Sequence, residues 1–255
     1  MGHDVMWSNS AVNAIKGSCN IYFSHLADRL NAGLLQQWLL KFGYGSKVLA
    51  RQDILAQAPP AGQTPLPRRY LLERAGIVHS GDPSAVTGGG TLPPIADHEK
   101  KMFGIGQGSF RVTPIEVAAA MAAISRRGIY RRPCLFASAP RSSDGYLDLD
   151  ISPETIDTIR DGMYGVVNEE GGTANRAFRS AGFRTAGIRV FGKTGSTEAP
   201  EHAWFGGFAE DNRGRALAFA VLIEGGQSGG QDASPLARDM IRLCMEAGYL
   251  GNTGR

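Results

Sequence analysis

The stretch VFGKTGSTEAP (Val190–Pro200) places a lysine, a threonine and a glycine directly after a short apolar run that predicts a strand. Lys193 offers a positive charge to a carboxylate, and the Thr194 hydroxyl can bond the same group. Gly195 leaves the strand edge open to a substrate, and the backbone N–H of Ser196 can face an oxyanion. On its own, such a short pattern more often marks an exposed strand end.

Two further strands are expected after this one, in 202–211 and 215–226, with a turn signal at Asp211–Gly214 between them. Short links between successive strands predict an antiparallel meander. A last helix is expected from Ser234, with one apolar face made of Leu236, Met240, Ile241 and Cys244.

Helices are expected before the sheet. Apolar residues recur at helical spacing in 21–30 and again in 34–42, where we expect the stripe to pack in the core. Thr113 and Glu116 form a capping box with a proline between them, and Ser152 caps another helix that also starts on proline and that we expect to end at 171–172. Helices followed by an antiparallel sheet that helices flank predict an α+β fold.

Composition excludes several classes of protein. The 255 residues carry a formal net charge of +3, too weak to indicate nucleic-acid or anionic-membrane binding. The 3 cysteines and 5 histidines show no metal-ligand spacing, so we expect neither a metal site nor a cofactor. No apolar run approaches the ~20 residues of a membrane helix, and the first residues do not resemble a signal peptide.

Residues 57–101, rich in proline and glycine, predict a long loop excursion.

A second pattern lies far upstream, in KGSCNIYF (Lys16–Phe23). Ser18 and Asn20 form an S-x-N pattern just before a predicted helix. Serine can pass a proton, and asparagine can orient a substrate amide or a neighbouring lysine. Alone, this pattern is more typical of a helix cap.

Together and in this order, the two patterns resemble the second and third motifs of the penicillin-recognising serine acyl transferases. Longer stretches resemble the transpeptidase domain of class B penicillin-binding proteins, in that family's order and across most of the chain. These stretches are AIKGSCNIYFSHLADRL, GIGQGSFRVTPIEVAAAMAAISRRG, GMYGVVNEEGGTA, VFGKTGSTE and HAWFGGFAED.

The resemblance implies a D,D-transpeptidase that cross-links peptidoglycan stem peptides by serine acyl transfer at D-Ala-D-Ala and that binds β-lactams. Ser18 and Asn20 would shuttle a proton and orient the substrate. Lys193 and Thr194 would hold the terminal carboxylate beside Gly195, and Ser196 would supply an oxyanion N–H. The family also implies an extracytoplasmic location with a membrane anchor, which we do not find in this sequence, and divisome or elongasome partners.

The family's first motif, S-x-x-K, carries the nucleophilic serine and its lysine base, yet no serine of the 255 residues has a lysine three positions on. We therefore expect 1–255 to be a partial transpeptidase domain, incomplete at its N-terminus and inactive alone. Two alternatives stay open. One is a non-catalytic scaffold or binding protein, although losing a central helix would expose apolar surface. The other is a β-lactamase or D,D-carboxypeptidase relative, against which the long Pro/Gly segment and the GQG…VTPIEVAAAMA stretch count.

Overall fold

A three-stranded antiparallel sheet stands at the centre of the molecule in the computed structural model, which describes residues 7–46, 75–81, 92–133 and 146–251. Its strands β3 (Ile188–Glu198), β4 (Glu201–Asp211) and β5 (Ala216–Glu224) follow one another in space as in sequence. The predicted meander is therefore confirmed. Among the described residues β3 pairs with β4 alone, so β3 is an edge strand of this part of the structure.

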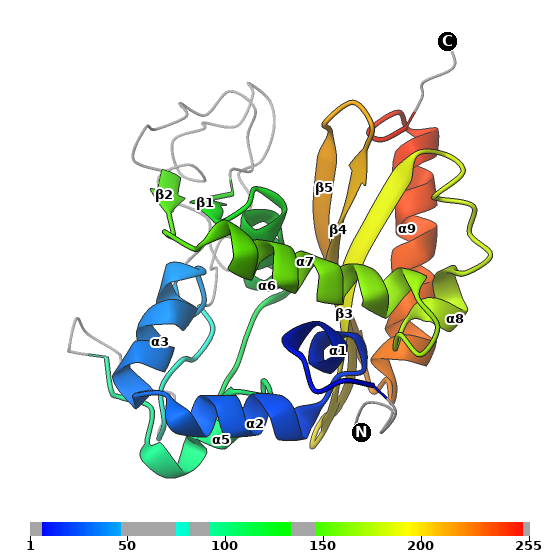
Figure 1. Cartoon of the computed structure of the whole chain (residues 1–255). Coiled ribbons are helices and arrows are strands. Elements are labelled where there is room, and N and C mark those ends of the chain that lie inside the picture. Colours follow the sequence, from blue (N-terminus) through cyan, green and yellow to red (C-terminus); the bar gives the residue numbers. More distant parts are fainter. Residues whose placement is uncertain (1–6, 47–74, 82–91, 134–145, 252–255) are drawn as a thin grey trace, which may run out of the picture.

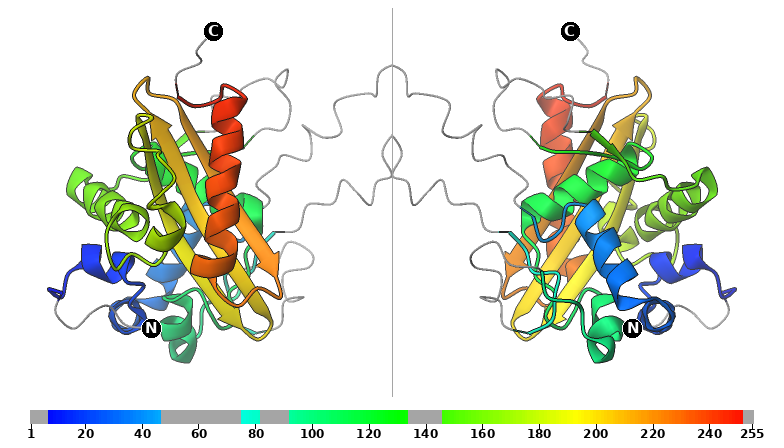
Figure 2. Two further views of the ribbon diagram at one scale, coloured as in Figure 1. Left: turned by 90° about the vertical axis from the view of Figure 1, so that its right-hand side faces the viewer. Right: turned by 90° about the vertical axis from the view of Figure 1, so that its left-hand side faces the viewer.

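Helices cover both faces of the sheet, which makes the fold α+β as predicted. Helix α9 (Ser234–Glu246) lies on one face, and α6 (Pro114–Ser125) and α7 (Pro153–Asn168) lie on the other (Figures 1 and 2). Because side chains alternate between the two faces along each strand, the apolar core has one part on each side of the sheet. The buried Phe205 packs on the α9 side, whereas the buried Phe208 packs on the other side against Phe191.

The predicted helix starts are confirmed where capping sets them. The Thr113 hydroxyl accepts from the Glu116 N–H at 3.3 Å, and the Glu116 carboxylate accepts from the Thr113 N–H at 2.7 Å. Ser152 caps α7 by accepting from the Thr155 N–H, although α7 ends at Asn168, before the predicted 171–172. These contacts satisfy N–H groups that a helix start otherwise leaves unpaired.

Two predicted apolar faces are wrong in part. Helix α3 (Ala32–Lys41) has no buried residue, and its Leu34 is 43% exposed. In α9 the buried residues include Ala237 and Ile241, whereas Leu236 is 53% exposed. The π-helical turn η5 (Gly229–Ala233), which leads directly into α9, was not predicted.

The N-terminal part contains the expected helix α2 (Asn20–Arg29) and an unexpected short helix, α1 (Ala11–Lys16). The Ser10 hydroxyl accepts from the Asn13 N–H and starts α1. Ile15 then packs against α7 at Gly162, where a side chain would collide with it. This contact fixes the loop between α1 and α2 beside the sheet.

The predicted excursion 57–101 lies largely outside the described residues. Its described end is more ordered than expected, with η3 (Asp97–Glu99), α5 (Lys100–Phe103) and an antiparallel bridge between Ile77 and Arg111. The remaining elements are β1 (Ile129–Arg131), β2 (Tyr146–Asp148) and α8 (Asn175–Phe178). Among the described residues, no helix has the length and apolar character needed to cross a membrane.

Candidate active site

The fold brings the two sequence patterns into direct contact. The Lys193 Nζ atom on β3 donates to the Ser18 Oγ atom at 2.7 Å, across 175 positions of sequence. Ser18 belongs to the loop between α1 and α2, and Figure 1 shows α1 beside β3. A charge-assisted hydrogen bond of this kind orients both groups.

The backbone at Ser18 is unusual. Ser18 has φ = 54°, in the left-handed region that residues other than glycine rarely adopt. Its loop is tied back to the end of α1, because the Ser18 N–H donates to Ile15 O and the Cys19 N–H donates to Ala14 O at 2.9 Å. A strained conformation that the surroundings enforce is typical of functional sites.

Lys193 has a lowered pKa, and its ammonium group has one more N–H than the two acceptors described for it. Burial lowers the pKa of Lys193 from 10.5 to about 8. Its ammonium group also donates to the backbone carbonyl of Thr194 at 2.8 Å. With Ser18 and Thr194 as its acceptors among the described residues, the third N–H can reach an incoming anion.

The residues after Lys193 line the edge of β3, and Thr173 and Gly229 hold their side chains by hydrogen bonds. The Thr194 and Thr173 hydroxyls are hydrogen-bonded at 2.7 Å, and the Ser196 hydroxyl accepts from the Gly229 N–H at 3.1 Å. Gly229 packs so closely that a side chain there would collide with the carbonyl oxygen of Gly195. The turn η5 thus packs directly against β3 at Gly195 and Ser196.

Sequence reasoning singled out Asn20, two positions after Ser18, and missed Thr173. Asn20 is the first residue of α2 and is exposed, with no side-chain hydrogen bond to Ser18 or Lys193. Thr173 belongs to the GGTA stretch, which gave only a general resemblance. Its contact with Thr194 depends on how α7 meets β3, which no local pattern reveals.

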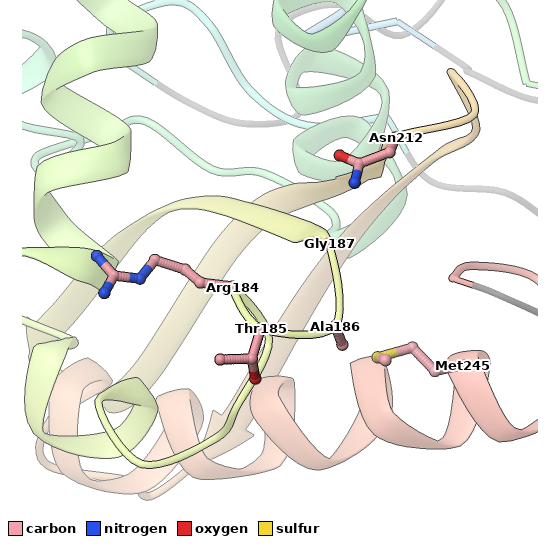
Figure 3. A pocket seen from close by; sticks show the side chains of 6 residues that line it. All are labelled: Arg184, Thr185, Ala186, Gly187, Asn212 and Met245. Carbon is pink, nitrogen blue, oxygen red and sulfur yellow. The ribbon is translucent and has the colours of Figure 1, made fainter.

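A shallow hollow lies at the other end of β3, before its first residue (Figure 3). Its lining includes Arg184, Asn212 and Met245, and none of the predicted site residues. The predicted residues Ser18 and Lys193 meet instead at the edge of β3 beside the α1–α2 loop, which is the candidate site.

Comparison with known proteins identifies the family of the chain. The family model described as "Penicillin binding protein transpeptidase domain" matches residues 4–242. The peptidoglycan D,D-transpeptidase MrdA of Haemophilus influenzae is 27% identical over 249 residues, covering 89% of this chain and 35% of that protein. MrdA of Escherichia coli K12 is 26% identical, covering 96% of this chain and 38% of that protein. The chain thus spans little more than a third of the length of these relatives.

Solved structures show the same fold. Penicillin-binding protein PBP2 of Helicobacter pylori matches with a TM-score of 0.68 at 25% identity, covering 94% of this chain and 40% of that one. PBP2 of Pseudomonas aeruginosa, in complex with WCK 5153, matches with a TM-score of 0.65 at 25% identity, covering 96% and 49%. The motifs, the fold and the match over residues 4–242 agree, and the chain belongs to the penicillin-binding protein transpeptidase family, in the class B branch that the sequence indicated.

Proposed function

We propose that this chain carries the substrate-binding and proton-transfer part of a peptidoglycan D,D-transpeptidase, with D-Ala-D-Ala stem peptides as acyl donors and β-lactams as mimics. The observation that carries the proposal is the 2.7 Å contact between Lys193 Nζ and Ser18 Oγ, which joins the S-x-N and K-T-G motifs. Solved structures of penicillin-binding protein A from Mycobacterium tuberculosis include imipenem and penicillin G acyl-enzyme complexes, which supports the choice of ligand.

Each motif residue has a role in this proposal. Lys193 and Thr194 bind the terminal carboxylate of the donor, and the Ser196 N–H binds the oxyanion. When a serine oxygen attacks the penultimate carbonyl and the C–N bond breaks, the proton that this serine loses reaches the departing D-Ala amine through Ser18, which takes up one proton as it gives up its own. Asn20 orients the donor amide. The attacking serine is not among these residues, because no serine here has a lysine three positions on.

The relatives also suggest a protein partner and a cellular location. A solved complex joins the Helicobacter pylori PBP2 to MreC, and we propose a partner of that kind for this chain. An extracytoplasmic location follows from the proposed substrate, since stem peptides are cross-linked outside the cytoplasmic membrane.

The experiment that tests this function is equilibrium binding of diacetyl-L-Lys-D-Ala-D-Ala to the 255-residue chain. The matched control ligand is the same peptide with a C-terminal amide, which lacks the carboxylate. We expect the amide to bind at least roughly tenfold more weakly, because a hydrogen bond to a charged group is worth more than a neutral one. Equal binding of the acid and the amide would contradict the proposal.

The lowered pKa of Lys193 predicts how this binding depends on pH. Only the protonated lysine attracts the carboxylate, so affinity should be full below the pKa of about 8 and should fall above it. We expect the peptide to bind about tenfold more weakly at pH 9 than at pH 7. Both amines of the peptide are acetylated and do not titrate. An affinity that is flat across this range would show that Lys193 does not hold the carboxylate.

A further inference from the structure

A side chain from outside the sheet occupies the free edge of β3. The Nε2 atom of Gln107, in the loop between α5 and α6, donates to the backbone carbonyl of Ser196 at 3.1 Å. In an antiparallel ladder, successive residues turn their backbone groups alternately toward and away from the partner strand. Because the Ser196 carbonyl accepts from Gln107 rather than from β4, it faces the free edge of β3, and the N–H of the same residue shares that direction.

The same alternation applies two residues earlier. The carbonyl of Thr194 accepts from Lys193 Nζ at 2.8 Å, so it too faces the free edge. The outward carbonyls on either side of Gly195 are therefore each held by a side-chain donor, Lys193 and Gln107. An extended peptide that adds to this edge needs those carbonyls as acceptors for its own N–H groups.

The loop that carries Gln107 is anchored, so the side chain can move without the backbone. The Gln107 N–H donates to Met102 O at 2.8 Å, and the Ser109 hydroxyl donates to Glu99 Oε1 at 2.7 Å. Gly106 and Gly108 on either side have φ of 73° and 75°, which turns the chain sharply and presents residue 107. Gln107 itself is half-buried, and releasing Ser196 takes a rotation of its side chain alone.

Building on the proposed function, we propose that Gln107 is a gate on the acyl-donor edge of β3. In the free protein its carboxamide occupies the Ser196 carbonyl by a hydrogen bond. An extended peptide that carries an N–H donor and a terminal carboxylate displaces that carboxamide. The peptide N–H replaces the Gln107 N–H at Ser196 while the carboxylate binds Lys193. Because only the open fraction accepts the peptide, the gate lowers the apparent affinity by that fraction.

The variant Gln107→Met tests the gate, since methionine has similar length and cannot donate a hydrogen bond. We expect diacetyl-L-Lys-D-Ala-D-Ala to bind this variant roughly two- to tenfold more tightly, in line with the net worth of one hydrogen bond. The gain should lie in a faster association rate with an unchanged dissociation rate. Gln37→Met, on an exposed face of α3, is the matched control and should leave both rates unchanged.

The outcomes separate the two proposals. If the peptide binds the wild type better than its C-terminal amide does, and Gln107→Met binds the peptide no tighter, the gate is wrong and the proposed function stands. If neither protein distinguishes the acid from the amide, both are wrong. A gain in affinity that appears only as slower dissociation would also overturn the gate, because it would mean that methionine contacts the bound peptide. Thermal melts of each variant exclude a folding defect.

Discussion

Replacing Glu116 by alanine should lower the free energy of unfolding by at least about 3 kcal/mol, because three backbone N–H groups lose their acceptor at roughly 1 kcal/mol or more each. The carboxylate is 1% exposed and accepts from the backbone N–H groups of Gly45, Gly76 and Thr113 at 3.0, 2.8 and 2.7 Å. It therefore joins the start of α6 to two distant loops. Urea denaturation of both proteins measures the difference.

Glu154→Ala is the matched control, since Glu154 lies exposed in the first turn of α7. We expect that change to stay within about 0.5 kcal/mol of the wild type. Glu116→Gln should fall between the two, because an amide keeps an acceptor oxygen but places an NH₂ group against a backbone donor. A loss below 1 kcal/mol in Glu116→Ala would contradict the role assigned to this carboxylate.

Lys193→Ala should weaken binding of diacetyl-L-Lys-D-Ala-D-Ala roughly 30-fold or more. The substitution removes the ammonium that faces the proposed carboxylate site, and truncating one partner of a buried charged pair costs about 2 kcal/mol or more. Isothermal titration of the wild type and the variant measures the change. Lys41→Ala, in the last turn of α3, removes a lysine remote from β3 and should leave the affinity unchanged.

A loss of less than threefold in Lys193→Ala would remove the lysine from the proposed site. Ser18→Ala separates binding from proton transfer, because in our proposal Ser18 acts on the leaving group rather than on the carboxylate. That variant should bind the peptide within a few-fold of the wild type. Comparable losses in both variants would instead indicate that the Lys193–Ser18 contact is needed to hold the site together.

Much of the fold was predictable because its signals are local. Capping at Thr113 and Ser152, and strand alternation before and after Asp211–Gly214, depend on a few neighbouring residues, and the structure confirms them. The exposed Leu34 and Leu236 show the limit of such reasoning. An apolar stripe indicates which side of a helix is able to pack, but whether another element covers it depends on the rest of the fold.

The candidate site also contains residues that the sequence predicted and residues that it did not. Lys193 and Ser18 were predictable from short motifs, and the structure places them in contact, although their roles remain predictions. Thr173 and Gln107 were not singled out, because a lone threonine or glutamine has no pattern of its own. Each gains its significance from contact with β3, across 21 and 89 positions of sequence.

The central claim is that this chain carries the carboxylate-binding half of the site without an acylating serine. Intact-mass spectrometry after incubation of the 255-residue chain with penicillin G tests it most directly. We predict an unchanged mass, together with retained reversible binding of the stem-peptide analogue. A stoichiometric gain of one penicillin on a serine would contradict the account, because it would show that the chain contains a nucleophile that its motifs do not reveal.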